Sequence, residues 1–125
     1  MSGLTLDAGA LIAFEKNDRK VVALFARALE FGYPLAAPAG AVGQVWRDGR
    51  RQARLARLLA AQEVEVEPLD DQTARAAGQL CGVMRTSDVI DASVVLCARK
   101  RAHRIVTSDP ADLRRLAPKL PLIVV

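Results

Sequence analysis

The sequence predicts an α/β domain in which helices cover both faces of a central, mostly parallel sheet. Short apolar runs alternate along the chain with longer segments of helical periodicity, in the repeated order of strand and then helix. No linker, internal repeat or low-complexity tract interrupts this alternation. The 125 residues are the length of one domain, so we expect residues 1–125 to form a single unit.

The first half of the chain begins with an apolar run at 4–6, which is a candidate strand. An apolar face repeats at helical spacing over 21–29, and Gly32 and Pro34 end that helix. Two later helical patterns are separated near Gly49. We expect the elements of this half to lie, in order, as a strand at 4–6, helices at 8–14 and 21–29, a strand at 33–37, and helices at 39–46 and 52–61.

The second half contains the pattern of an edge strand and that of a buried helix. Val64 and Val66 alternate with glutamates, which is typical of a half-exposed or edge strand. The segment 87–100 is the clearest buried helix. We expect its inward residues to be mainly Val89, Ile90, Val94, Val95 and Cys97. The remaining elements are expected as a helix at 71–83, a strand at 105–107, a helix at 110–116 and a strand at 122–125.

The composition is that of a soluble globular protein, with 51% apolar and 26% charged residues. No apolar run approaches the roughly 20 residues that span a bilayer. Residues 1–7 lack the basic and apolar regions of a signal peptide, so we expect a cytoplasmic protein. The net charge of +4 is compatible with a polyanionic partner such as nucleic acid.

The two cysteines and the single histidine exclude several kinds of site. Cys81 and Cys97 lie in apolar helical context without metal-ligand spacing, so we expect buried free thiols. His103 is the only histidine, which excludes any mechanism that needs two. Because His103 follows charged residues, we expect it at the surface.

Aspartates occupy the positions where sites form in parallel sheets, beyond the carboxyl ends of the strands. Asp7 follows the first strand and Asp109 follows the strand at 105–107. Asp88 and Asp91 open the helix before that strand and lie about one turn apart. Each of them alone has a simpler explanation, since aspartate is a favoured helix N-cap.

The simpler explanation weakens when the aspartates are considered together. Two carboxylates about 5 Å apart repel by roughly 3 kcal/mol at an effective dielectric of about 20. Serine or asparagine would cap a helix without that repulsion. A bound Mg²⁺ or Mn²⁺ would remove it, because both prefer oxygen ligands. Such a metal polarises a phosphoryl oxygen and helps to generate hydroxide as the nucleophile.

Three stretches combine these residues with a characteristic order and spacing: Leu4–Ala13, Asp91–Ala98 and Ile105–Leu113. Together they resemble the PIN-domain family and, within it, the VapC-type toxins of toxin–antitoxin systems, over essentially the whole chain. The resemblance implies a Rossmann-like, three-layer α/β/α sandwich and Mg²⁺- or Mn²⁺-dependent hydrolysis of RNA phosphodiester bonds. It also implies a homodimer and a small VapB-like antitoxin that enters the acidic groove.

The resemblance assigns roles to particular residues. Asp7, Asp91 and Asp109 look like the catalytic acids that hold the metal, and Asp88 looks like an auxiliary metal ligand. Thr107 and Ser108 lie where the family often has a hydroxyl near the metal.

One position departs from the family. On the helix after the second strand, Gln44 stands where the family usually has a glutamate. A carboxamide oxygen can ligate a metal or hold a water, but it has no charge and cannot act as a base. The alternative is therefore a weakly active or inactive PIN-fold module that binds RNA or a protein partner. A receiver or a dehalogenase-like phosphatase also uses an aspartate after a strand, but Gly9 stands where the phosphatase needs its second acid.

Arginines recur at helical spacing, at Arg47, Arg50, Arg51, Arg54 and Arg57. They form either a solvated helix face or a patch that contacts the phosphates of RNA. We expect Arg47, Arg50 and Arg51 to bind RNA, and Arg47 is the best candidate because it lies one turn from Gln44. Gly49 is expected to break the face. Trp46 is expected either in the core or at an interface with a partner.

Overall fold

In a computed structural model, which describes residues 3–125, the chain forms the expected alternation of strands and helices. Met1 and Ser2, at the start of the N-terminal stretch considered above, lie outside the described residues. The strands are β1 (Leu4–Leu6), β2 (Leu35–Pro38), β3 (Val64–Glu67), β4 (Arg104–Thr107) and β5 (Leu122–Val124). The helices are α1 (Ala8–Glu15), α2 (Arg19–Glu30), α3 (Ala39–Val45), α4 (Ala53–Ala60), α5 (Asp71–Met84), α6 (Val89–Arg101) and α7 (Pro110–Leu116).

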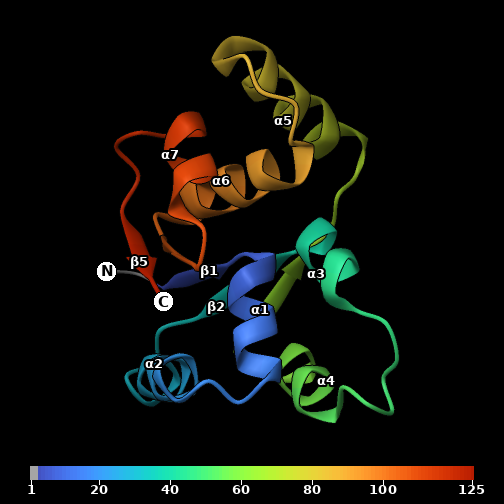
Figure 1. The fold of residues 1–125 in the computed structure, drawn as a ribbon, viewed down its shortest axis with the longest axis vertical. Helices are drawn as coiled ribbons and strands as arrows, with labels where there is room; N and C mark the ends of the chain where they lie inside the picture. The colour runs from blue at the N-terminus through green and yellow to red at the C-terminus, as the bar shows by residue number, and fades with distance from the viewer. Residues whose placement is uncertain (1–2) are drawn as a thin grey trace.

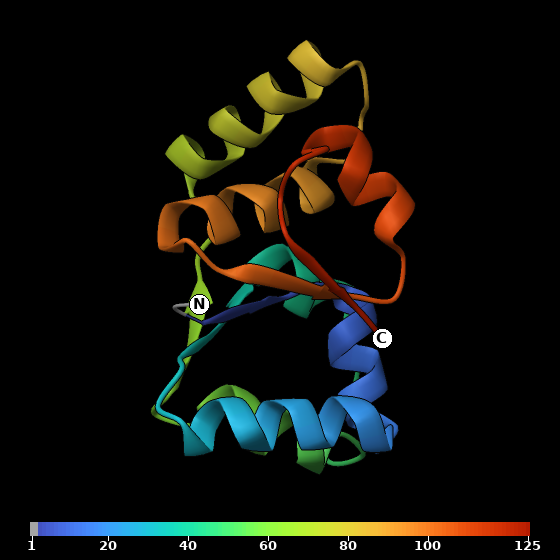
Figure 2. The same ribbon diagram turned by 90° about the vertical axis from the view of Figure 1, so that its left-hand side faces the viewer.

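Within residues 3–125 the strands make one five-stranded sheet in the order β3-β2-β1-β4-β5, and each neighbouring pair is parallel. The order is Rossmann-like and differs from the 2-1-3-4-5 order of receiver domains. Helices α5, α6 and α7 lie on one side of the sheet, and α1, α2 and α4 lie on the other (Figures 1 and 2). The predicted three-layer α/β/α sandwich is therefore confirmed.

The central strands carry almost only apolar residues because they lie in the hydrophobic core. β1 and β2 are buried along their whole length. In α6, Val94, Val95 and Cys97 are fully buried as expected, whereas Val89 and Ile90 are partly exposed. Ile90 is partly buried and packs against the core, so the prediction was wrong only for Val89, which is exposed in the first turn of α6.

The edge position of β3 was predicted correctly, but its burial pattern was not. Val66 is exposed and Glu67 is only 7% exposed, the reverse of a simple alternation. Glu67 is buried because Arg101 Nη1 lies 3.1 Å and Lys100 Nζ 3.4 Å from its Oε1 atom. The hydrogen bond from Arg101 overcomes the effect of burial and holds the pKa of Glu67 below its usual value.

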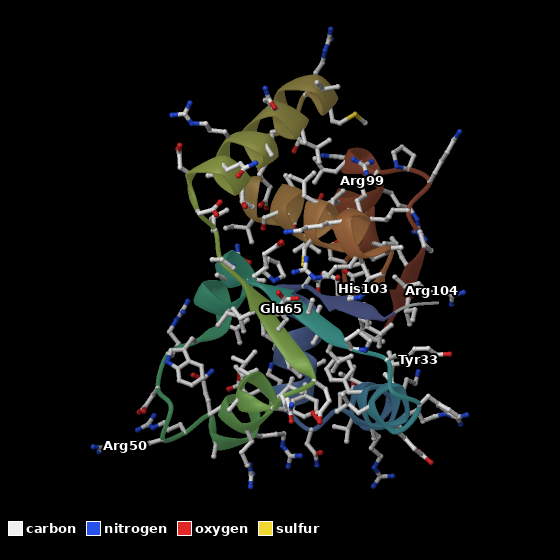
Figure 3. The ribbon with its side chains drawn as sticks, turned by 180° about the vertical axis from the view of Figure 1, so that it is seen from behind. Tyr33, Arg50, Glu65, Arg99, His103 and Arg104 are labelled. Atoms are coloured by element: carbon white, nitrogen blue, oxygen red, sulfur yellow. The ribbon has the colours of Figure 1, made fainter. Side chains whose placement is uncertain are left out.

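The prediction that His103 lies at the surface was also wrong. Its side chain is only 4% exposed, at the start of β4, and its Nδ1 atom lies 3.0 Å from Thr5 Oγ1 (Figure 3). Gly3 makes room for the ring, because a Cβ atom at Gly3 would lie 2.5 Å from His103 Nε2. Burial holds the pKa of His103 below its usual value.

The thiols of Cys81 and Cys97 are free and buried, as predicted. Trp46 is exposed, with 38% of its surface accessible, so its predicted place in the core was wrong and the interface with a partner stays a prediction. In residues 3–125, every helix is too short or too polar to cross a membrane.

Candidate active site

An acidic pocket of about 220 Å³ lies at the carboxyl ends of β1 and β4. Its walls come from the start of α1, from α3, from the start of α6, and from the segment that joins β4 to α7. The residues that line it are Asp7, Ala8, Gly9, Gln44, Asp88, Asp91, Ser108, Asp109 and Asp112. The structure thus brings together the four aspartates and the glutamine that the sequence singled out.

Asp7 is the most rigidly held of these acids. Its side chain is only 7% exposed, and its Oδ1 atom accepts a hydrogen bond of 2.8 Å from the backbone N–H of Ala10. Asp7 therefore caps α1, and it also hydrogen-bonds to the Thr107 side chain. Burial raises the pKa of Asp7, and the nearby charge of Asp109 adds to this effect.

Thr107 links two of the aspartates. Its hydroxyl is fully buried at the end of β4 and accepts a 2.9 Å hydrogen bond from the backbone N–H of Asp109. The same hydroxyl can donate its proton to the Asp7 carboxylate, with which it interacts. Thr107 is absent from the pocket wall, so its effect on the pocket comes through the two aspartates that it orients.

Asp109 differs from the other caps. It occupies the N-cap position of α7, but its carboxylate accepts no hydrogen bond from the described backbone of that helix. Proline at the first position of α7 removes one of the N–H groups that a cap would satisfy. The Asp109 side chain is exposed into the pocket and is not explained by capping.

Asp88 and Asp91 form the acidic start of α6. Asp88 Oδ1 accepts a 2.9 Å hydrogen bond from the backbone N–H of Asp91, so Asp88 is an N-cap, as its spacing suggested. Burial, followed by the charges of Asp88, Asp112 and Asp7, raises the pKa of Asp91 to about 6. Asp91 is therefore partly buried and surrounded by other carboxylates, and both conditions disfavour its charged form.

Asp112 is a site residue that the sequence analysis did not single out. It lies in the first turn of α7, three residues after Asp109, and lines the same pocket. The signal was available, because residues three apart on a helix share a face. With Asp112, five aspartates surround the pocket, which compensates in charge for Gln44.

The close approach of α1 to the β4–α7 segment explains a glycine in the pocket wall. A Cβ atom at Gly9 would overlap Ser108 Oγ. Glycine therefore lets the Ser108 hydroxyl lie over the start of α1, at the edge of the pocket. Gly9 and Ser108 together set the width of the opening.

The pocket's donors fit a hard divalent cation by their chemistry. Five carboxylates, one carboxamide and one hydroxyl supply only oxygen ligands, which Mg²⁺ and Mn²⁺ prefer. As the side chains stand, no three His, Cys, Asp or Glu residues within 3–125 are gathered closely enough to hold a metal ion. Mg²⁺ keeps several waters and needs direct contact with only one or two carboxylates. The elevated pKa of Asp91 is the second sign that this pocket lacks positive charge.

A second, larger cleft among the described residues differs from the acidic pocket in its charge. This cleft of about 570 Å³ between α5 and α6 has Glu67 and Asp70 as the acids among its described lining residues, beside Arg99 and Lys100. Its charges are balanced, so it lacks the unpaired negative charge of the acidic pocket.

The arginine face is broken, as Gly49 suggested. α3 ends at Val45 and α4 begins at Ala53, so Arg47, Arg50 and Arg51 lie in the intervening loop. Arginine is absent from the described residues that line the acidic pocket. Arg47 Nη1 donates to the carbonyls of Gly43 at 3.2 Å and Trp46 at 2.6 Å, which satisfies the end of α3.

No protein-family model and no curated protein matches the sequence. Solved structures do match the fold. A chain in the structure of VapBC2 from Rickettsia felis, bound to a promoter DNA fragment, is 13% identical with a TM-score of 0.74, over 98% of both chains. A chain of FitAcB from Neisseria gonorrhoeae is 15% identical with a TM-score of 0.65, over 96% of both chains. A chain of a toxin–antitoxin complex from Klebsiella pneumoniae is 18% identical with a TM-score of 0.64, over 89% of both chains. The likeness establishes a PIN-like fold.

Proposed function

We propose that this protein is a metal-dependent endoribonuclease that hydrolyses RNA phosphodiester bonds and acts as the toxin of a toxin–antitoxin pair. The observation that carries the proposal is the acidic pocket, in which five aspartates from separate segments line one hollow. The toxin–antitoxin assemblies with the same fold support the biological role.

Asp7, Asp91 and Asp109 are the residues that would hold Mg²⁺ or Mn²⁺, with Asp88 and Asp112 beside them. When bound, the cation would polarise a phosphoryl oxygen and lower the pKa of a water molecule. Gln44 and Ser108 would assist as neutral oxygen ligands or by holding water.

The chain's own contribution is to orient the acids and to set the pH at which they ionise. The backbone of α1 and the hydroxyl of Thr107 orient the Asp7 carboxylate. With no cation bound, Asp91 retains a proton up to about pH 6. A cation that binds the ionised form displaces this proton, so its affinity rises with pH through that range.

The test is the cleavage of a structured RNA by the purified protein in Mn²⁺, Mg²⁺ or EDTA. We expect cleavage with either metal, none in EDTA, and a loss of at least about 100-fold in Asp7→Asn and Asp91→Asn. The exposed Asp71→Asn, in the first turn of α5, is the matched control and should cleave normally. Cleavage that persists in both pocket variants would refute the proposal.

A second candidate is a PIN-fold module that binds RNA or a protein without cutting, and Gln44 is the observation that favours it. Gln44→Glu separates the two candidates. If the native chain is inert and Gln44→Glu creates a nuclease, the native chain is a binding module. If both cleave, Gln44 serves in an active pocket.

The partners belong to the same proposal. We expect a homodimer, measured by light scattering at several protein concentrations, and a small VapB-like antitoxin as the cellular inhibitor. Co-expression with the product of a neighbouring small gene tests the latter, because a true antitoxin would copurify and abolish cleavage.

A further inference from the structure

The loop between α3 and α4, residues 46–52, swings out from the body of the molecule between the two helices (Figure 1). We call it the arginine loop, since it carries Arg47, Arg50 and Arg51. The backbone N–H groups of Arg51 and Gln52 both donate to the Asp48 carbonyl, at 3.1 and 3.0 Å. These two hydrogen bonds form a turn within the loop.

Gln52 anchors the arginine loop from inside. Its side chain is only 6% exposed. Its Oε1 atom accepts from the backbone N–H groups of Arg47 at 2.7 Å and Asp48 at 2.9 Å. Its Nε2 atom donates to the Val45 carbonyl and to Glu15 Oε2, each at 3.0 Å. The two acceptor lone pairs and the two N–H groups of this amide are all used, and they tie the loop to α3 and α1.

Two further contacts stiffen the loop. Gly49 lies on the Trp46 ring, since a Cβ atom there would approach Trp46 Cζ2 to 3.0 Å. Asp48 Oδ1 accepts a 3.0 Å hydrogen bond from the backbone N–H of Arg50, which forms an Asx-type turn. The loop is therefore shaped before any ligand binds, which lowers the entropic cost of binding.

The side chains of this ordered loop point outward and are cationic. Arg50 extends away from the body of the molecule (Figure 3). The Arg51 side chain is 89% exposed, and its Nε atom lies 3.9 Å from Asp48, too far for a strong pair. A rigid backbone that presents two solvated guanidinium groups matches the forked geometry of phosphate oxygens.

The loop directly follows α3, the helix whose Gln44 lines the acidic pocket. The amide of Gln52 returns to the Val45 carbonyl, and Val45 directly follows Gln44 in the pocket wall. Even a fully extended chain from Gln44 to Arg51 would span at most about 25 Å. A nucleic acid strand whose scissile phosphate enters the pocket would reach Arg51 by extending over no more than this distance from Gln44.

The geometry points to the arginine loop as a preformed clamp for the phosphate backbone of single-stranded RNA, with Arg50 and Arg51 as phosphate contacts and Gln52 as the residue that positions them. The inference rests on the proposed ribonuclease function for its choice of RNA. Arg47 has a different task, since its guanidinium already binds the carbonyls at the end of α3. The pocket repels phosphates, so a nearby cationic surface is needed to bring RNA to it.

Binding can be measured without cleavage. Fluorescein-labelled oligouridine is titrated in EDTA, and its anisotropy is followed between 50 and 300 mM salt. The fluorescence of Trp46, the only tryptophan, reports independently from the base of the loop. The test variant is Arg50→Ala/Arg51→Ala, and the matched control is Arg19→Ala/Lys20→Ala, which removes the same charge from the exposed start of α2.

The double loop variant should bind RNA roughly tenfold more weakly than the wild type at 0.1 M salt. Its salt slope, which is the slope of log affinity against log salt concentration, should be shallower by about 1.4, because each contact with a single-strand phosphate contributes about 0.7. The control should retain nearly the wild-type slope. RNA should change the Trp46 fluorescence of the wild type. Equal slopes for the loop variant and the wild type would overturn the inference, even if the protein cleaves RNA.

Gln52→Ala distinguishes the effect of the loop's shape on RNA binding from the effect of the charges of Arg50 and Arg51. Because both arginines remain, its salt slope should match the wild type while its affinity falls several-fold; a thermal melt confirms that it is folded. Affinity unchanged in a folded Gln52→Ala protein would remove Gln52 from the inference. If RNA binds through the loop but is not cleaved in Mn²⁺, the proposed ribonuclease activity is refuted, whereas the inference about the arginine loop stands. Polyglutamate binding that depends on the loop, with RNA binding that does not, would assign the loop to an acidic protein instead.

Discussion

Replacing Asp91 with asparagine should make the metal-free protein more stable, because the pocket holds more negative charge than the fold needs. Burial and the charges of Asp88, Asp112 and Asp7 raise the pKa of Asp91 from 3.8 to about 6. That difference corresponds to about 3 kcal/mol at 1.36 kcal/mol per pH unit. Partial exposure and solvent screening reduce it to about 1–2 kcal/mol.

The net gain is smaller, since asparagine also loses the favourable interaction of a charge with the start of α6, about 0.5 kcal/mol. We therefore expect Asp91→Asn to gain about 1 kcal/mol at pH 8 in EDTA. For a domain of this size, that raises Tm by roughly 4 °C. A stabilising change at a pocket acid is typical of a residue that serves binding rather than folding.

The stability that Asp91→Asn gains over the wild type should increase with pH. Below about pH 3, Asp91 is protonated in both the folded and the unfolded chain, so it costs nothing. As the pH rises, the unfolded chain ionises first, and the cost grows until it is complete above about pH 6. Differential scanning fluorimetry from pH 4 to 8 should show the advantage of Asp91→Asn growing over this range.

The exposed Asp71 provides the control, because it lies at the equivalent first turn of α5 and pairs with Arg75 at 3.0 Å. Asp71→Asn should leave Tm unchanged or slightly lower at every pH. An Asp91→Asn protein that is less stable than the wild type at pH 8, or equally stabilised at pH 4, would refute the electrostatic account of the pocket.

Three further predictions concern residues around the sheet. Thr107→Val should cost about 1–3 kcal/mol in urea unfolding, because it leaves the Asp7 carboxylate and a backbone N–H without their partner, whereas Thr107→Ser should cost less; equal losses would contradict a role for the hydroxyl. Glu67→Gln should lower the free energy of unfolding by about 1–2 kcal/mol at pH 7, because Arg101 loses a charged partner. The advantage of the wild type should vanish as the pH falls through the lowered pKa of Glu67, below 4.5. An advantage that survives at pH 2 would contradict the ion pair. The lowered pKa of His103 means that its contribution to stability is present above the unfolded value of 6.5 and is lost on acidification, so its NMR titration should lie below 6.5 in the folded protein; a midpoint above 6.5 would show that the ring is not buried as described.

The sequence was sufficient for the sheet and the meeting of the main acids. The carboxyl ends of parallel strands share one edge, so Asp7 and Asp109 had to come together once β1 and β4 were recognised. Gln44 followed from its position after β2. The same reasoning found the broken arginine face, because glycine and the helical period are local signals.

The errors concern burial that depends on distant partners. His103 is buried because Gly3 and Thr5, about a hundred residues away in sequence, make space and a hydrogen bond for it. Glu67 is buried because α6 delivers Arg101 to the edge of the sheet. A single sequence without structure carries no signal for such pairings.

The remaining omissions were local but ambiguous. Asp112 has the spacing of a pocket residue and also that of an ordinary acid in the first turn of a helix. The anchoring of the loop by Gln52 is invisible in sequence, because a glutamine before a helix has many roles. Only the four hydrogen bonds of its amide distinguish it.

The central claim is that the acidic pocket binds a divalent cation, and anomalous scattering from crystals soaked in Mn²⁺ tests it most directly. We predict an anomalous peak inside the pocket, with oxygen atoms of Asp7, Asp91 or Asp109 about 2.2 Å away, and no such peak in crystals of Asp91→Asn. A pocket without manganese at millimolar concentration, or manganese bound only at sites remote from these three aspartates, would contradict the claim.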